Sequence, residues 1–338
     1  MTGSSKTFQP GSKSESPTES YNADSDLVDY ILGITFEIWE QGQIEKIHDY
    51  YASHVEVFGL DSMTSSATQM VENTHTTLAS YPDRLLIADD VITTGTTKQG
   101  FSSHRIISPM TNLGDTAFGA GTGKHIQAMN IADCEVNDGV ITREWLVRDN
   151  LAVVRQLGFD PIDCAKIISG NFDDRQKAWL SSEFTRVSNG EQRHATSTEE
   201  TNEVLDFAHD VLTNCWVKGD HKALESVYAP YCLLKRAPLG IYSGRDRVLE
   251  HYANWRDVFP DASLSIDHVC SQPFDRNSQR VAVRWSVAGF HRNEFSGIPA
   301  TGKPIYILGV THWQLVDGRI SAEWTVFDEL AMLAQTQI

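Results

Sequence analysis

The sequence predicts an α+β protein of two tandem cone-shaped domains, each with three N-terminal helices packed on a curved antiparallel sheet. Three observations support this fold class. Short motifs recur at a nearly constant distance along the chain, which indicates an internal duplication. Apolar residues at helical spacing come first in each half, and residues at strand spacing follow them in one run. Helices grouped before strands are typical of α+β folds, whereas alternation would indicate a parallel sheet.

The duplication is clearest near the end of each half. Glu144-Trp145 recurs as Glu323-Trp324, an offset of 179 residues (323 − 144 = 179). The other matching pairs in this register are Thr122-Gly123-Lys124 with Thr301-Gly302-Lys303, Asp138-Gly139 with Asp317-Gly318, and Asp149 with Asp328. Near the start of each half the offset is 177, between Leu27 and Val204 (204 − 27 = 177), so few insertions separate the copies.

Each half opens with a predicted helix, and the first begins near Asp26. The apolar stripes of these helices are Leu27, Ile31, Ile34 and Ile38 in the first half and Val204, Ala208, Val211 and Cys215 in the second. Gly42 and Gly219 follow them as expected C-caps. A short second helix comes next, and a third runs toward Tyr81-Pro82 and Phe259-Pro260.

The strands are best defined in the second half. From 281 to 288, large apolar residues alternate with small or polar ones, which is a strand period. The linker Asn293–Pro304 turns the chain, and Tyr306–Val316 is the next predicted strand. Asp317-Gly318 predicts a tight turn, after which Ile320–Phe327 pairs back.

The chain divides into four predicted parts. These are a tail at 1–25 that we expect to be disordered, domain 1 at 26–160, a linker at 161–200, and domain 2 at 201–338. Within the linker, Arg175–Thr185 has helical character and Ser188–Glu200 is expected to be flexible. The simplest interpretation of the linker is a spacer without chemistry of its own.

Composition narrows the classes of partner. The net charge of −17 and the isoelectric point near 5.0 disfavour nucleic acids and anionic membrane surfaces. No apolar run is long enough to span a bilayer, and the start of the chain does not resemble a signal peptide. The five cysteines are scattered without a C-x-x-C pair, so we expect buried, reduced thiols in a cytoplasmic protein.

Neither metal nor organic cofactor is expected. The twelve histidines form no H-x-H or H-E-x-x-H pattern. No glycine-rich phosphate loop opens a helix after a strand, so no nucleotide is implied.

The second half resembles the SnoaL-like polyketide cyclase family of the nuclear-transport-factor-2-like superfamily, over essentially all of 203–338. The residues that carry the resemblance are Trp216-x-x-Gly219-Asp220, Tyr228-Ala229-Pro230, Phe259-Pro260-Asp261, Arg284-Trp285, Gly289-x-His291, Phe295-x-Gly297-Ile298-Pro299, Thr301-Gly302-Lys303, Asp317-Gly318-Arg319-Ile320, Glu323-Trp324 and Asp328. The resemblance implies a small-molecule pocket inside each cone. It also implies cofactor-free acid/base chemistry, such as aldol ring closure or epoxide hydrolysis. The first half is a degenerate version of the same pattern.

The chain departs from the family at the position of the acid/base residue. Family members tend to carry Asp-x-x-Asp on the last strand, with the first Asp as the acid/base. Here Leu146 and Thr325 stand at that first position, and only Asp149 and Asp328 remain at the second. The family's pocket His aligns near Ala132 and Thr311. The family mechanism therefore cannot be transferred directly.

Two residues of the second half are candidate catalytic groups. Asp328 could exchange protons if a dry pocket raised its pKa. It also precedes a helical segment, Glu329–Gln335, where an Asp is a natural N-cap, and Asp149 precedes Asn150–Leu157 in the same way. His291 is a possible general base at the pocket rim or a hydrogen-bonded structural residue.

The candidate binding residues lie on the same strands and on the third helix. They are Arg284, Glu323, Thr325, Thr311, Tyr252, His251 and Trp324. Arg284 and its counterpart Arg105 are equally consistent with an anion clamp and with an ion pair on the outer face of the sheet. Glu323 and Trp324 must point to opposite faces. If the Trp faces the core, the Glu points outward, yet the family's catalytic position shares the face of the Glu, and a bulge would reconcile the two.

These observations predict a small-molecule-binding protein, with the ligand in the second copy. A cofactor-free cyclase, isomerase or hydrolase acting on a polyketide-like or other apolar carbonyl compound is one interpretation. A ligand-binding or assembly module that has lost the family's acid/base Asp is the alternative. In both, the first copy completes an internal pseudo-dimer through the outer faces of the two sheets, and a further homo-oligomer remains open.

Overall fold

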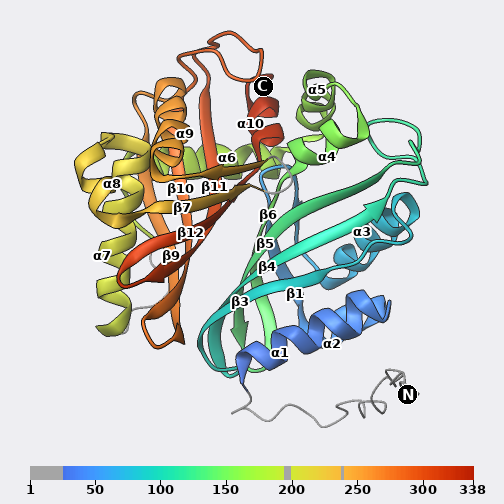
Figure 1. Ribbon diagram of the computed structural model, residues 1–338. Coiled ribbons are helices and arrows are strands. Elements are labelled where there is room, and N and C mark those ends of the chain that lie inside the picture. Colours follow the sequence, from blue (N-terminus) through green and yellow to red (C-terminus); the bar gives the residue numbers. More distant parts are fainter. Residues whose placement is uncertain (1–25, 194–198, 237–239) are drawn as a thin grey trace, which may run out of the picture.

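The computed structural model describes residues 26–193, 199–236 and 240–338. The tail at 1–25, predicted to be disordered, and part of the link predicted to be flexible lie outside the described residues. Figure 1 shows domain 1, coloured blue to green, beside domain 2, coloured yellow to red. Within the described residues, no helix has the length and apolar character that crossing a membrane requires.

Domain 1 contains five helical segments before and among its strands and a helix after the last strand. Its elements are α1 (Leu27–Ile34), the π-helical turn η1 (Thr35–Glu40), the 3₁₀ turn η2 (Ile44–Lys46), α2 (Ile47–Tyr50), β1 (Tyr51–Phe58), β2 (Met63–Thr64), α3 (Ala67–Ser80), β3 (Ile87–Gly95), β4 (Gln99–Thr111), β5 (His125–Asn137), β6 (Val140–Arg148) and α4 (Asn150–Leu157).

Two helices and then domain 2 follow. The elements are α5 (Pro161–Asn171), α6 (Asp174–Ser188), α7 (Glu199–Thr213), the π-helical turn η3 (Asn214–Lys218), α8 (His221–Val227), β7 (Tyr228–Arg236), β8 (Gly240–Ser243), α9 (Arg245–Val258), β9 (Ser263–Asp275), β10 (Ser278–Phe290), β11 (Pro304–Val316), β12 (Arg319–Phe327) and α10 (Glu329–Gln335).

The two sheets have the same topology. Their strand orders are β2-β1-β6-β5-β4-β3 and β8-β7-β12-β11-β10-β9. The pairing register is also the same, because Glu144 stands opposite Val57 and Glu323 opposite Leu234. The predicted α+β fold class, with two related domains, is therefore confirmed.

One detail of the sheets differs from the prediction. After the second helix of each domain the chain forms a strand, β1 or β7, which pairs in parallel with the last long strand, β6 or β12. Each sheet is therefore mixed rather than purely antiparallel. The prediction missed these strands because their partners lie some 90 residues away in sequence (323 − 234 = 89), beyond the reach of local pattern.

The helices follow the capping and periodicity expected from the sequence. The Asp26 side chain accepts a hydrogen bond from the Val28 amide and begins α1, and the whole apolar stripe from Leu27 to Ile38 is buried. Helices α4 and α10 have the predicted bounds. Asp149 and Asp328 cap them by accepting hydrogen bonds from backbone amides of the first turn.

The linker forms two packed helices, one of which contacts both domains. The Trp179 ring of α6 stacks on Phe58 of domain 1 at 5.7 Å between centroids, and its edge meets Tyr306 of domain 2 at 5.5 Å. Arg186, also on α6, forms a buried ion pair with Asp267 on β9 at 3.1 Å. Helix α6 therefore fixes the two sheets to each other.

The outer faces of the two sheets meet across a buried ionic contact. Asp133 on β5 accepts hydrogen bonds from the Arg284 Nε atom at 2.6 Å and from the His268 Nδ1 atom at 2.9 Å. The Arg284 guanidinium also lies 3.5 Å from the centre of the Trp145 ring. Burial would raise the pKa of the Asp133 carboxyl, but His268 and Arg284 outweigh it and hold that pKa below its usual value.

The pseudo-symmetric counterpart of this contact uses Arg105. Its Nη1 atom lies 3.2 Å from His312 Nδ1 of domain 2, and its Nε atom donates to Asp89 at 2.6 Å. Its guanidinium lies 4.0 Å from the centre of the Trp324 ring. The second contact therefore repeats the arginine-on-tryptophan arrangement with a histidine in place of the aspartate.

Replacing Asp133 with Asn tests how much the ionic contact of Asp133 contributes to the stability of the fold. Because Arg284 would remain buried without a counter-charge, we expect the free energy of unfolding to fall by about 3–5 kcal/mol. Asp163→Asn is the control, since Asp163 is exposed and its pair with Lys166 contributes about 0–1 kcal/mol. Urea unfolding measures both variants, and equal midpoints for the two would contradict the assigned role.

Candidate functional site

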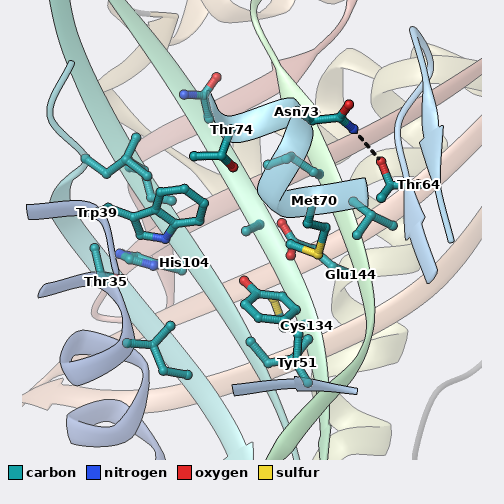
Figure 2. A pocket seen from close by; sticks show the side chains of 18 of the residues that line it. Thr35, Trp39, Tyr51, Thr64, Met70, Asn73, Thr74, His104, Cys134 and Glu144 are labelled. Atoms are coloured by element: carbon teal, nitrogen blue, oxygen red, sulfur yellow. Dashed lines mark hydrogen bonds between the residues drawn. The ribbon is translucent and has the colours of Figure 1, made fainter. Parts of the chain in front are cut away.

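Domain 1 contains a cavity of about 140 Å³ between its helices and the inner face of its sheet. Figure 2 shows the side chains that line it. Trp39 comes from the π-helical turn, Thr74 from α3, Tyr51 from β1 and Glu144 from β6. The cavity therefore lies where the three helices cover the sheet.

Glu144 is the buried acid of this cavity. The Tyr51 hydroxyl hydrogen-bonds to its carboxyl group, but the Glu144 Oε2 atom has no hydrogen-bond partner among the described residues. Burial raises the pKa of Glu144 to about 7, and Arg148 and Tyr51 offset only part of that rise. A carboxyl group with this pKa can release and accept a proton near neutral pH.

His104 faces the same cavity from β4. Burial, together with the positive charge of Arg105, lowers the pKa of His104 to about 4, so its ring is neutral near pH 7. Its Nε2 atom is buried and has no hydrogen-bond partner within the described part of the chain. The carboxyl group of Glu144 and the neutral imidazole of His104 therefore both line the same cavity.

The equivalent acid in domain 2, Glu323, is fully hydrogen-bonded by its surroundings. Its donors are the Tyr228 hydroxyl at 2.6 Å, the Trp313 indole N–H at 3.0 Å, the Thr325 hydroxyl at 2.6 Å and the Tyr252 hydroxyl. Four donors satisfy both carboxylate oxygens. Glu144 keeps only the donor equivalent to Tyr228, which is Tyr51.

Smaller side chains in domain 1 account for the cavity. In the shared register, Tyr252 of domain 2 corresponds to Thr74 of domain 1, Trp313 to Cys134, and Trp285 to Ile106. In domain 2 the aromatic rings pack together, and Trp216 contacts both Trp285 and Phe327. Trp285 also lies so close to Gly309 that a β-carbon there would be 2.2 Å from its ring.

A second cavity of about 430 Å³ adjoins the first. Arg84, in the loop before β3, and Arg148, at the end of β6, line both cavities. Burial and the neighbouring Arg148 lower the pKa of Arg84 to about 10. The two cavities thus meet at a pair of guanidinium groups.

The structure brings four of the predicted domain 2 residues together. Glu323, Thr325, Thr311 and Tyr252 form one buried hydrogen-bond network, in which the Thr311 and Thr325 hydroxyls are 2.9 Å apart. His251 precedes Tyr252 on α9 and lies against Tyr242. Burial and then the charge of Arg236 lower the pKa of His251 to about 3.

Two predicted binding residues lie on the other face of the sheet. Arg284 and Trp324 both belong to the contact between the domains. Of the two alternatives for Arg284, the structure thus shows an ion pair on the outer face. The sequence could not decide which face Glu323 and Trp324 occupy, because both faces of β12 are buried.

The two candidate catalytic residues stand apart from this network and from each other. The His291 Nδ1 atom is 3.0 Å from the Thr301 hydroxyl in the loop after β10. Asp328 caps α10 and accepts a hydrogen bond from Asn150 of domain 1 at 2.5 Å. Burial, followed by the nearby Asp61, raises the pKa of Asp328 well above its usual value. Their catalytic roles remain predictions.

The sequence prediction did not select the domain 1 residues, although a comparison between the copies points to them. Glu144 was visible as the partner of Glu323 in the repeated Glu-Trp motif. Its neighbours Thr74, Cys134 and Ile106 stand where domain 2 has large aromatic residues. Loss of side-chain volume at three positions around one acid is the pattern that could have indicated the cavity.

The described residues contain no group of three or more His, Cys, Asp or Glu side chains placed to hold a metal ion. All five cysteines are buried free thiols, as expected from their spacing. Burial and the neighbouring Glu144 raise the pKa of the Cys134 thiol far above its usual value, so it lines the cavity as an uncharged group.

The model of the SnoaL-like polyketide cyclase family matches residues 207–336, which confirms the resemblance of the second half to that family. No curated protein matches the chain. Similar solved structures include IdmH, a putative polyketide cyclase from Streptomyces antibioticus, with 26% identity over 39% of this chain and 97% of that one and a TM-score of 0.33. A SnoaL-like polyketide cyclase from Agrobacterium tumefaciens has 18% identity over 40% of this chain and 99% of that one, with a TM-score of 0.34.

Replacing Glu144 with Gln tests its ionisation through stability. Between pH 4.5, the ordinary pKa, and about 7, the folded chain keeps the Glu144 proton that the unfolded chain has lost. The free energy of unfolding therefore falls as pH rises through this window, by on the order of 3 kcal/mol from this group. Glu144→Gln removes this contribution, so urea unfolding at about pH 5 and about pH 8 should show a smaller loss than in the parent.

Two features of this measurement make it specific. Asp149, whose pKa burial raises to about 7, adds a loss of the same sign that both proteins share. Glu72→Gln, at an exposed position on α3, is the matched control and should keep the pH dependence of the parent. A pH dependence in Glu144→Gln identical to that of the parent would mean that Glu144 has an ordinary pKa.

Proposed function

We propose, from the SnoaL-like polyketide cyclase domain that residues 207–336 match, that this chain binds a small organic molecule and transforms it by cofactor-free acid/base chemistry in domain 1. Domain 1 repeats the strand order and register of the matched domain. The observation that carries the proposal is Glu144, a buried acid with one unpaired oxygen facing a cavity. Such groups cluster at functional sites.

The proposed reaction begins with removal of a proton from carbon next to a carbonyl group. The Glu144 carboxylate takes this proton, and the electron pair moves into the carbonyl to form an enolate. A neutral His104 ring or the Tyr51 hydroxyl donates a hydrogen bond to the enolate oxygen. In isomerisation, Glu144 returns the proton to a different atom of the same molecule.

Ring closure uses the same proton balance. The enolate carbon attacks a second carbonyl group of the same molecule, and the alkoxide that results accepts the proton held by Glu144. One new carbon–carbon bond forms, and no oxidant, reductant or further reactant is consumed. An acid with a pKa close to the working pH suits both proton transfers.

A second function, ligand binding without turnover, also has support. The position of the family's acid/base Asp holds Leu146 in domain 1 and Thr325 in domain 2. Glu144 lies two residues before Leu146 and shares its face of β6, so it could replace the missing Asp or merely bind. Formation of a product separates the two functions.

The test incubates the full chain with β-keto esters, poly-β-ketones and epoxides and identifies products by mass spectrometry. Parent protein should convert at least one class, and Glu144→Gln should lower kcat by about 100-fold or more, the usual contribution of a general acid/base. Glu72→Gln controls for the loss of one exposed carboxylate.

Three further variants test whether the site lies in domain 2 instead. Asp328→Asn, His291→Ala and Glu323→Gln change the groups that the sequence predicted there. Loss of turnover in any of them, with the parent rate in Glu144→Gln, would contradict the assignment to domain 1. Saturable binding without product across all three compound classes would favour the binding function.

Replacing Thr74 with Tyr should give Glu144 the packed surroundings that Glu323 has in domain 2. The new ring occupies the cavity, and its hydroxyl can donate to Glu144 as Tyr252 does to Glu323. We expect ligand binding to be lost while the thermal midpoint is kept or raised, because a void is filled and a buried acid is paired. Thr68→Tyr, at an exposed position on the same helix, should change neither.

A further inference from the structure

The junction of the two domain 1 cavities is lined by polar side chains together with Val57 and Leu146. Arg84, Arg148, Asn130 and Asn73 each line both the inner cavity of about 140 Å³ and the outer one of about 430 Å³. Asn130 stands directly opposite Arg148 in the pairing of β5 with β6. A molecule that extends from one cavity into the other must pass these groups.

The two arginines are incompletely neutralised by the protein. The Arg84 Nε atom donates to the Ser108 hydroxyl at 3.3 Å, and in the described residues no carboxylate lies within ion-pair distance of it. Arg148 has one acidic partner, Asp61, at 3.5 Å. The other oxygen of Asp61 accepts from Asn150 at 3.1 Å. Within ion-pair distance the two guanidinium groups have one carboxylate between them, so one positive charge at the junction has no direct counter-ion.

An excess of positive charge is unusual for this acidic chain, and its partial burial beside a second guanidinium is energetically unfavourable. The chain as a whole carries −17, so a local excess of positive charge does not follow from composition. Arg84 is partly buried, and the neighbouring Arg148 repels it, which the lowered pKa of Arg84 reflects. Buried charges are ordinarily paired, and one singly charged anion would complete the junction.

The inner cavity limits the size of what lies beyond the arginines. A cavity of about 150 Å³ accommodates a benzene molecule, so 140 Å³ suits one six-membered ring. Its walls include Trp39, Ile106 and Leu146, which suit an apolar ring, and Glu144 faces the same space. The outer cavity leaves room for an extension of the molecule beside Phe118.

We infer that domain 1 takes a carboxylic acid, with a single ring in the inner cavity beside Glu144 and the carboxylate bound between Arg84 and Arg148. This inference rests on the proposed function of the cavity and names the class of its substrate. Paired N–H donors of guanidinium groups match the two oxygens of a carboxylate. The same contact holds the ring next to Glu144, so charge recognition also positions the reacting carbon.

The experiment compares two probes of nearly equal size, one ending in a carboxylate and the other in a neutral amide. Calorimetric titration of the full chain with 3-phenylpropanoate and with neutral 3-phenylpropanamide needs no variant. We expect the acid to bind about 10-fold more tightly or better, the difference that a charge-assisted hydrogen bond contributes. Equal affinities, or a preference for the amide, would overturn the inference.

Variants locate the contact. Arg84→Met and Arg148→Met should each weaken binding of the acid by about 10- to 100-fold and leave binding of the amide within about twofold. Arg84→Lys and Arg148→Lys keep the charge and should recover part of the affinity. Arg143→Met is the matched control, because Arg143 is on β6 but points to the opposite face, where it pairs with Glu135.

The outcomes separate this inference from the proposed function. If Glu144→Gln abolishes turnover while acid and amide bind alike, the proposed function stands and the carboxylate site does not exist. If the acid is preferred but Arg84→Met and Arg148→Met bind it as the parent does, the anion site lies elsewhere and the inference fails. If neither probe binds, the carboxylate site is excluded, and the product assay alone decides the proposed function.

Discussion

Each sheet of this protein buries both of its faces. The face on which a strand residue lies therefore determines whether it contacts the helices of its own domain or the other domain. Helices cover the inner face, while the other domain and α6 cover the outer face. Successive residues of a strand point to opposite faces. Glu144 therefore enters the cavity and Trp145 enters the contact between the domains, where Arg284 stacks on it. Binding chemistry and domain assembly thus use alternate positions of the same strand.

The two inner faces meet this constraint in different ways. In domain 2, four donors surround Glu323, and aromatic rings fill the space around it. In domain 1, small side chains replace the rings, so Glu144 keeps one donor and a raised pKa. The same acid in the same register is a structural centre in one copy and a candidate reactive group in the other. The size of the neighbouring side chains, rather than the acid itself, decides whether the acid is hydrogen-bonded or faces a cavity.

Much of the fold followed from the sequence, whereas the location of the cavity did not. The duplication, the first helices, and the bounds of α4 and α10 come from local repeats, periodicity and caps, which a single sequence displays. Strands β1 and β7 depend on distant partners. The family pattern is better preserved in the second copy, which favoured it as the binding copy, but a cavity depends on side-chain volumes contributed by several strands and helices at once. Alternation could not assign Glu323 to a face, because β12 has buried residues on both faces.

The aromatic packing around Glu323 in domain 2 bears on how the lining of the domain 1 cavity can change. A void and an unpaired acid both weaken the fold that contains them. Trp179 of α6 and the ion pair of Asp133 with Arg284 join domain 1 to domain 2. A single copy would have to stay stable in spite of its cavity and its unpaired buried acid. Here contacts with domain 2 stabilise domain 1, so the residues that line its cavity can change in evolution with less risk of unfolding.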